Sequence, residues 1–317
     1  MQTLGNLSAE NKTIKQISAG HRLFILSAAA AIVAAVCWIA TLLLDNSGNL
    51  KPTADGYTIA KEIRYSYTLQ NKTNRLIPKA ELWVHAPVKQ TAGQRCLNLN
   101  ANYPYQLLAD GGGNQVLYFT FENLAPYASR LISIKADLLV ARRANPIAAG
   151  PQTTDLNPET YVESDHPAIR RAARQLQTSD PIQTIDAVFG WVATQVRYSG
   201  YNAREGGAVY ALENKKGDCT EYMDLFVALC RAKGIPARRI GGYICPENAV
   251  LRAVDYHNWS EFYADGLWQI ADPQNKVLME NQGDYIAMRI IRASADDPLG
   301  SYNRFRVKGE GLKVRMN

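Results

Sequence analysis

The chain has 317 residues, of which 47% are hydrophobic and 20% charged, and its formal net charge is +6. This length allows two domains with separate cores. Residues 289–317 carry +4 of the charge, and we interpret them as a basic, solvated tail; contact with anionic lipid or an acidic polymer is the alternative. A nucleic-acid surface would combine a basic stripe with stacking aromatic residues, so no nucleic-acid partner is expected.

An apolar run comes first in the chain. Residues 23–44 are 22 residues without a charge, and at about 1.5 Å per residue they span a hydrocarbon core of roughly 30 Å. We therefore predict one transmembrane helix at 23–44. A cleaved signal peptide, the alternative, would have a shorter apolar part with a small-residue exit, whereas this run ends at Leu44-Asp45. Cys37 also suggests a lipoprotein, but the apolar run continues past it.

The charges around this run predict its orientation. Lys12, Lys15 and Arg22 precede it, whereas Lys51 is the only basic residue among the 11 that follow. Basic residues favour the cytoplasmic side of a membrane. Residues 1–22 are therefore expected in the cytoplasm, and the large C-terminal part on the periplasmic or extracytoplasmic side of the inner membrane.

Residues 52–143 are predicted to form a β-sandwich. Ile59, Ile63, Tyr65, Tyr67 and Leu69 alternate with polar residues, and further apolar runs occur at 82–84, 107–108, 116–121 and 131–140. Several short strands at this spacing are typical of a sandwich. We see no catalytic set of side chains here, so we expect this domain to position the site or to bind an envelope protein. Residues 144–160, with three prolines, are predicted to be a linker.

Residues 161–288 are predicted to begin with helices. Asp165-His166-Pro167 and Asp180-Pro181 each combine a cap residue with proline at the first helical position. A further helix is predicted to follow Asp218, a good N-cap, and to stop at Gly234. Cys219 then lies in its first turn, where unpaired N–H groups and the helix dipole favour thiolate over thiol.

A β-hairpin is predicted to follow this helix. Asp265-Gly266 separates two runs of alternating apolar residues, which is a strong signal for a two-residue hairpin loop. This loop would place Glu261 opposite Ile270. His257 would then share a face with Trp259 and lie diagonally across from Asp272, at about 7–8 Å between backbones. A slip of one residue would send His257 and Asp272 to opposite faces.

Cys219, His257 and Asp272 each have an ordinary structural explanation when taken alone. A single cysteine is usually a small buried apolar residue, and a histidine in a strand is often part of the core. Together, the thiol, imidazole and carboxylate supply the parts of a Cys-His-Asp site for acyl transfer. The three residue types, their order and their placement therefore predict a catalytic site.

These residues resemble the core of the transglutaminase-like superfamily, of the bacterial membrane-anchored type, whose members are relatives of papain-type thiol proteases. The resemblance covers about Pro181 to Lys276 and rests on Tyr198, Gly207-Ala208, Gly217-Asp218-Cys219, the run from Leu225 to Arg238, Gly242-Tyr243, the run from His257 to Tyr263, Trp268 and Asp272-Pro273. It implies that Cys219 is the nucleophile, His257 the general base and acid, and Asp272 the residue that orients the imidazole. Asn258 departs from the pattern, because a small residue such as alanine often follows the histidine, and this departure concerns substrate fit.

The expected chemistry begins with attack of the Cys219 thiolate on an amide carbonyl, and His257 then protonates the departing nitrogen to leave a thioester. Water gives hydrolysis, which we favour slightly, and an amine gives cross-linking. The Cys219 N–H is expected to stabilise the oxyanion. The second donor stays open between Asn214 and Tyr201. Trp259 is predicted to bind substrate as a wall of the acyl site, with simple packing as the alternative.

The remaining cysteines and the cofactor question complete the sequence prediction. Cys96, Cys230 and Cys245 are expected to be buried thiols, and a disulfide between Cys230 and Cys245 is the alternative. We see no CxxC motif and no histidine pair at metal spacing, so no metal or cofactor is expected.

The predicted fold class is α+β: one transmembrane helix, a β-sandwich and a papain/transglutaminase-like catalytic domain. We expect a membrane-anchored thiol enzyme that acts on protein or peptide amides in the cell envelope. A non-catalytic scaffold or binding subunit of an envelope or secretion assembly is the alternative.

Overall fold

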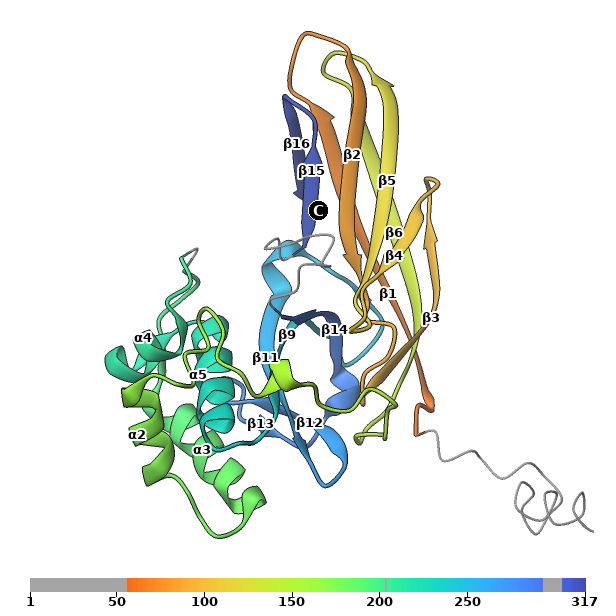
Figure 1. The fold of residues 1–317 in the computed structure, drawn as a ribbon. Coiled ribbons are helices and arrows are strands. Elements are labelled where there is room, and N and C mark those ends of the chain that lie inside the picture. The colour runs from red at the N-terminus through yellow and green to blue at the C-terminus, as the bar shows by residue number, and fades with distance from the viewer. Residues whose placement is uncertain (1–55, 203, 293–303) are drawn as a thin grey trace, which may run out of the picture. The chain divides into compact units, whose positions relative to one another are not determined.

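The structure is a computed structural model that describes residues 56–202, 204–292 and 304–317. The predicted transmembrane helix at 23–44 lies outside these residues. Among the helices that are described, none has both the length and the apolar character needed to cross a membrane. The described residues form a β-rich part and a mixed α+β part (Figure 1).

The β-rich part is built from long strands whose residues are alternately buried and exposed, as the sequence predicts. The longest is β1 (Ile59–Asn71), in which Ile63, Tyr65, Tyr67 and Leu69 are buried. The other strands of this part that lie close together in sequence are β2 (Ile77–Ala86), β3 (Gln94–Ala101), β4 (Gln106–Ala109), β5 (Gln115–Leu124) and β6 (Ser129–Val140). The sequence did not predict β3. This strand is only partly buried along most of its length, so its apolar alternation is weak.

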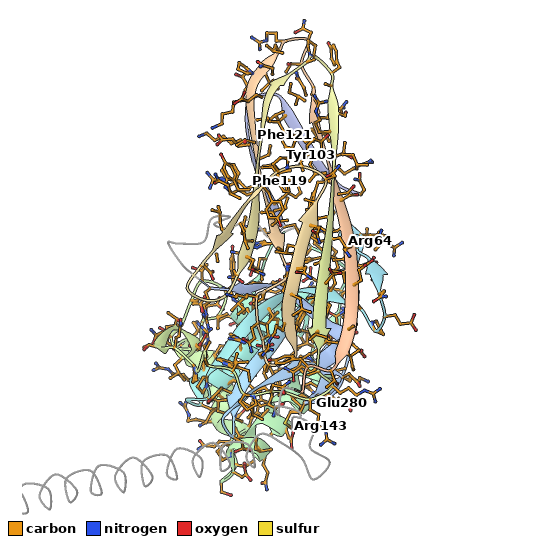
Figure 2. All side chains as sticks on the ribbon, turned by 90° about the vertical axis from the view of Figure 1, so that its right-hand side faces the viewer. Arg64, Tyr103, Phe119, Phe121, Arg143 and Glu280 are labelled. Atoms are coloured by element: carbon orange, nitrogen blue, oxygen red, sulfur yellow. The ribbon has the colours of Figure 1, made fainter. Side chains whose placement is uncertain are left out.

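Two sheets enclose the core of this part. One has the order β10-β1-β6-β3, where β10 is Ala249–Val250, and the other has the order β15-β2-β5-β4, where β15 is Phe305–Lys308. Their inward-facing apolar residues form one cluster. Aromatic rings contribute strongly to it: Phe121 contacts Tyr103 edge-on, with ring centroids 5.2 Å apart, and stacks with Phe119 at 6.4 Å (Figure 2).

The prediction of a solvated basic tail at 289–317 is wrong for the described part of that segment. Strand β16 (Leu312–Met316) pairs antiparallel with β1, and β15 pairs with β2, so these two C-terminal strands join different sheets of the sandwich. Leu312 and Val314 pack against the core, whereas Lys313 and Arg315 lie on the exposed face. The alternation of apolar and basic residues is therefore a strand pattern, which net charge alone conceals.

The mixed α+β part has four helices among the described residues, named here with their bounds: α2 (Pro167–Gln175), α3 (Pro181–Gln195), α4 (Gly207–Asn214) and α5 (Cys219–Ala232). The predicted starts at Pro167 and Pro181 are confirmed, and Asp180 caps α3 by accepting a hydrogen bond from the Ile182 N–H at 2.7 Å. The cap of α2 is His166. The short helix α4 was not predicted, because its N-cap, Gly206, makes no side-chain capping bond.

Helix α5 packs against a five-stranded sheet with the order β13-β12-β11-β9-β14. The strands are β9 (Ala237–Ile244), β11 (Tyr256–Ala264), β12 (Leu267–Asp272), β13 (Val277–Leu278) and β14 (Tyr285–Ile291). Two short strands, β7 (Arg197–Tyr198) and β8 (Lys216–Gly217), pair with each other beside α5. Arg289, predicted to begin the tail, is instead buried within β14.

Strand β14 is an edge strand of this sheet, so the backbone groups on its outer side need partners from elsewhere. Two amide side chains of the β-rich part supply them. Gln94 accepts from the Ala287 N–H at 2.7 Å and donates to the Ala287 carbonyl at 2.9 Å. Asn114 does the same for Ile290, at 2.7 and 2.9 Å. The sandwich therefore completes the hydrogen bonding of the sheet that bears His257 and Asp272.

The predicted linker at 144–160 contains one short 3-10 helix, Thr153–Asp155, and contacts the mixed part at several points. Trp268 donates its indole N–H to the Ala149 carbonyl at 3.1 Å, and Arg292 pairs with Asp155 at 3.1 Å. Glu159 pairs with Arg231 and Arg239, at 2.6 and 3.1 Å. The segment is thus held against the mixed part.

Close approach of β9 and β14 requires glycine at position 242. A Cβ added there would lie 2.1 Å from the Ile286 carbonyl oxygen. We expect Gly242→Ala to separate the two strands and to lower the free energy of unfolding by about 1–3 kcal/mol, as measured by urea denaturation. Gly111→Ala is the control, because nothing lies within 4 Å of its added Cβ. If the two variants are equally stable, the contact between the new Cβ and the Ile286 carbonyl oxygen is relieved without loss of stability, and the prediction is wrong.

Candidate active site

The start of α5 fixes the position of Cys219, the first residue of the helix. Asp218 is the N-cap, as predicted, and its Oδ1 accepts a hydrogen bond from the Thr220 N–H at 2.8 Å. Glu221 completes a capping box, because its Oε2 accepts from the Asp218 N–H at 2.8 Å. A Cβ on Gly217 would meet the Glu221 Cβ at 2.3 Å, so glycine is needed there.

The same two carboxylates also hold a neighbouring loop. The second oxygen of Asp218 accepts from the Asn202 N–H at 2.9 Å, and the second oxygen of Glu221 accepts from the Gly206 N–H at 2.8 Å. Burial raises the pKa of Glu221, although these backbone N–H groups oppose the shift. These hydrogen bonds hold the start of α5, which carries Cys219, against Asn202 and Gly206.

A cleft of about 1160 Å³ lies beside Cys219, whose side chain is partly exposed. His257 and Asn258 of β11 line the cleft together with Cys219, and residues 253–255 form part of its wall. The structure therefore brings the predicted thiol and imidazole to the same cavity. Asp272 is 1% exposed and lies behind the imidazole.

The register of the hairpin is the predicted one. Glu261 pairs with Ile270 and Ala264 with Leu267, across a loop in which Asp265 and Gly266 both have positive φ. This register brings the His257 Nε2 to 2.7 Å from the Asp272 Oδ2. Since Nε2 faces the carboxylate, Nδ1 is the nitrogen that is left for the thiol.

The electrostatics of the pair favour a charged imidazole. Burial of the ring works to lower the pKa of His257, but hydrogen bonds to Asp272 and Cys219, with the negative charges of both groups, outweigh burial and raise the pKa to about 9. Burial likewise works to raise the pKa of Asp272, but the hydrogen bond and charge of His257 lead the interactions that lower it. At neutral pH the arrangement is therefore an imidazolium beside a carboxylate, which can hold a thiolate as its second partner.

Two further residues hold the carboxylate, and sequence reasoning missed both. The amide of Asn275 donates to the Asp272 Oδ2 at 2.7 Å, and the Tyr285 hydroxyl donates to the same oxygen at 2.9 Å. The position of Asn275, three residues after Asp272, could have suggested a local side-chain bond. Tyr285 lies on β14, and only the order of the strands brings it here.

Trp259 does not line the cleft, contrary to its predicted contact with substrate. It is 1% exposed and belongs to an apolar cluster with Ile240 and Ile270. Its ring stacks with the His257 imidazole, with centroids 6.4 Å apart and planes 17° apart, and it meets the Tyr285 ring edge-on at 5.1 Å. Because side chains alternate along β11, Trp259 lies on the same face of the sheet as His257. It is buried there and packs against the imidazole instead of lining the cleft.

The two predicted candidates for the second oxyanion donor differ in position. Asn214 is not among the residues that line the cleft, and its amide donates to the Tyr210 carbonyl at 2.9 Å. Tyr201 lines the cleft but is 82% exposed. The Cys219 N–H, at the first position of α5, is one of the amides that the helix leaves unpaired.

The cysteines differ in how far they are buried. The four cysteines in the described residues are free, so the predicted alternative of a disulfide between Cys230 and Cys245 is wrong. Those two are buried, and Cys96 is partly exposed. Burial raises the pKa of Cys96 and of Cys245 to about 11 in each case. Among these four, Cys219 is the cysteine that lines the cleft.

Comparison with known proteins concerns the same part of the chain. Residues 170–273 match the family model of the transglutaminase-like superfamily, and this range includes Cys219, His257 and Asp272. Residues 170–273 therefore form a region similar to the transglutaminase-like superfamily. The predicted resemblance and the α+β fold class of this part are confirmed.

Individual relatives are distant. Uncharacterized protein ML0607 of Mycobacterium leprae (strain TN) is 25% identical over 146 residues, which are 44% of this chain and 51% of the relative. The chain thus spans about half the length of that curated relative. The solved structure of a candidate cysteine protease from Cytophaga hutchinsonii covers 82% of this chain and 91% of its own, with 18% identity and a TM-score of 0.55. This similarity shows a shared fold.

A second solved structure is more distant. The periplasmic domain of TgpA from Pseudomonas aeruginosa covers 71% of this chain and 93% of its own, with 15% identity and a TM-score of 0.38. At this TM-score the similarity supports no conclusion about function.

The raised pKa of His257 gives a direct spectroscopic prediction. We expect the imidazole to titrate near pH 9 by NMR, with Asp272→Asn moving the midpoint well below 9, because the carboxylate is the strongest of the groups that raise it. The chain has four histidines, so His257→Gln identifies the resonance by its loss. An unshifted midpoint in Asp272→Asn would contradict the assigned pairing.

The same pair predicts how stability depends on pH. Because the pKa of His257 is raised from 6.5 to about 9, its contribution to stability is complete below about pH 6.5 and is lost as pH rises through about 9. The coupling energy between His257 and Asp272, measured by a double-mutant cycle in urea, should therefore be larger at pH 6 than at pH 10. A coupling energy that is larger at pH 10 than at pH 6 would contradict this prediction.

Proposed function

We propose that the chain is a thiol enzyme that cleaves amides of proteins or peptides in the cell envelope. The observation that carries this proposal is a cysteine at the start of a helix that shares one cleft with a His257–Asp272 pair bonded at 2.7 Å. Cys219 would be the nucleophile, His257 the acid and base, and Asp272 the residue that orients the ring. The match of residues 170–273 to the transglutaminase-like superfamily supports the same class of chemistry.

The reaction follows from these positions. The thiolate forms a bond to the amide carbonyl carbon, and the oxyanion accepts a hydrogen bond from the Cys219 N–H. The imidazolium then gives its proton to the amide nitrogen, the C–N bond breaks, and the amine leaves a thioester behind. Water, deprotonated by His257, converts the thioester to a carboxylic acid and regenerates the thiol. An amine in place of water would give transfer or cross-linking.

We favour hydrolysis over cross-linking. Cys219 is partly exposed in a wide cleft, so water can reach a thioester there without a binding site of its own. Cross-linking would require the second substrate to exclude this water.

The lining of the cleft supports a polypeptide substrate. Five large apolar or aromatic residues on its walls are exposed to solvent: Tyr161, Tyr198, Tyr201, Ile244 and Val254. Exposed apolar groups gathered at a cavity are typical of a binding site rather than of an ordinary surface. The volume of about 1160 Å³ exceeds what a single small amide would fill.

We also propose that residues 23–44 anchor the protein in the inner membrane, with residues 56–317 on the extracytoplasmic side. The 22-residue length of the charge-free run and the three basic residues before it support this proposal. The β-rich part would then position the mixed part and offer a surface to an envelope protein.

Selective alkylation tests the enzyme proposal. In the full-length protein, iodoacetamide should modify Cys219 at least about ten-fold faster than Cys96, because the neighbouring imidazolium favours thiolate. Burial, by contrast, raises the pKa of Cys96 to about 11. Peptide mapping by mass spectrometry measures both rates in one sample. His257→Gln should remove most of the difference between the rates at Cys219 and Cys96.

His166→Gln is the matched control, because His166 caps α2 and is not among the residues that line the cleft. It should leave the Cys219 rate unchanged. If Cys219 reacts no faster than Cys96, and His257→Gln has no effect, the enzyme proposal fails and a non-catalytic scaffold becomes the better explanation.

A further inference from the structure

Two residues that line the cleft beside Cys219 each carry a buried polar atom with no hydrogen-bond partner within the described part of the chain. These atoms are the hydroxyl oxygen of Tyr256 and the Oδ1 of Asn258. A buried polar atom without a partner is costly, and native proteins keep few of them. Unpartnered atoms at a cavity therefore point to a ligand that completes them.

The two atoms lie close to each other. Tyr256 and Asn258 are alternate residues of β11 and share one face of the sheet, where Asn258 pairs with Gly241 of β9 and Tyr256 with Tyr243. If Gly241 had a Cβ, the Tyr256 oxygen would lie 2.0 Å from it and the Asn258 Oδ1 3.1 Å from it. Because residue 241 is glycine, there is space for the Tyr256 hydroxyl. The hydroxyl, a donor, therefore lies near the Asn258 Oδ1, an acceptor.

Both side chains are held in place. Asn258 donates its amide N–H to the Thr220 Oγ1 at 2.9 Å, and Thr220 directly follows Cys219 in the chain. The Tyr256 ring meets the Tyr243 ring edge-on at 5.5 Å, and the Arg304 guanidinium lies over it at 5.5 Å. A donor and an acceptor that are adjacent, rigid and buried form a site that is prepared before the ligand arrives.

We propose that Tyr256 and Asn258 form a subsite that binds one edge of an amide substrate: the hydroxyl donates to a carbonyl oxygen, and Oδ1 accepts from an N–H on the same edge. This inference rests on the proposed function and adds the residues that recognise the substrate. A single trans peptide group does not fit, because its C=O and N–H point in opposite directions. A primary carboxamide fits, and so does one residue of an extended backbone, whose N–H and C=O point to the same side.

Three small reagents that alkylate or thiolate Cys219 test the subsite. Iodoacetamide carries a primary carboxamide, N-iodoacetyl-alanine N-methylamide carries one extended backbone residue, and methyl methanethiosulfonate carries no amide. The measured quantity is the rate of each amide reagent at Cys219 divided by the rate of methyl methanethiosulfonate. This ratio cancels changes in thiolate content.

Tyr256→Phe and Asn258→Ala should each lower the ratio by about five-fold, the effect expected for one neutral hydrogen bond. A lower ratio for iodoacetamide identifies a subsite for a primary carboxamide. A ratio that falls only for the alanine reagent identifies a subsite for one residue of extended backbone. Tyr243→Phe is the matched control, because its hydroxyl contacts the Met316 Sδ at 3.3 Å and Tyr243 is not among the residues that line the cleft. Its ratios should equal those of the unmodified chain.

Unchanged ratios in both Tyr256→Phe and Asn258→Ala would overturn the subsite. That result differs from failure of the proposed function, in which all three reagents would react at Cys219 no faster than at Cys96, with no effect of His257→Gln. Thermal unfolding of each variant accompanies the rates. If Asn258→Ala is unstable because the bond to Thr220 is lost, Tyr256→Phe still decides the question.

Discussion

The hydrogen bond between His257 and Asp272 is the interaction on which the candidate site depends, and it exists only because β11 and β12 pair in one register. A slip by one residue would turn one of the two side chains to the opposite face. The two-residue loop at Asp265-Gly266 fixes that register from within the hairpin. Trp259 then closes the space beneath the imidazole, so the ring is held by packing as well as by the carboxylate.

The β-rich part contributes to this arrangement through β14. Gln94 and Asn114 satisfy the backbone of the edge strand, and β14 presents Tyr285, whose hydroxyl holds Asp272. A chain of hydrogen bonds and packing contacts thus leads from the sandwich to the imidazole. The β-rich part therefore has a structural role at the candidate site.

His257 lies between Tyr256 and Asn258 on β11, so the candidate chemistry and the proposed subsite meet on one strand. Cys219, His257 and Asp272 fall within the match to the transglutaminase-like superfamily. Asn258 and Tyr256 each carry a buried polar atom without a hydrogen-bond partner in the described part of the chain.

The sequence by itself determined what local rules govern. Capping by Asp218, the stop at Gly234 and the Asp265-Gly266 loop each depend on residues a few positions apart, so the start of α5 and the hairpin register could be predicted. Only the tertiary structure decided which strands are neighbours. Tyr285 beside Asp272, β16 beside β1 and the burial of Trp259 all depend on contacts between segments distant in sequence, and local patterns do not encode these pairings.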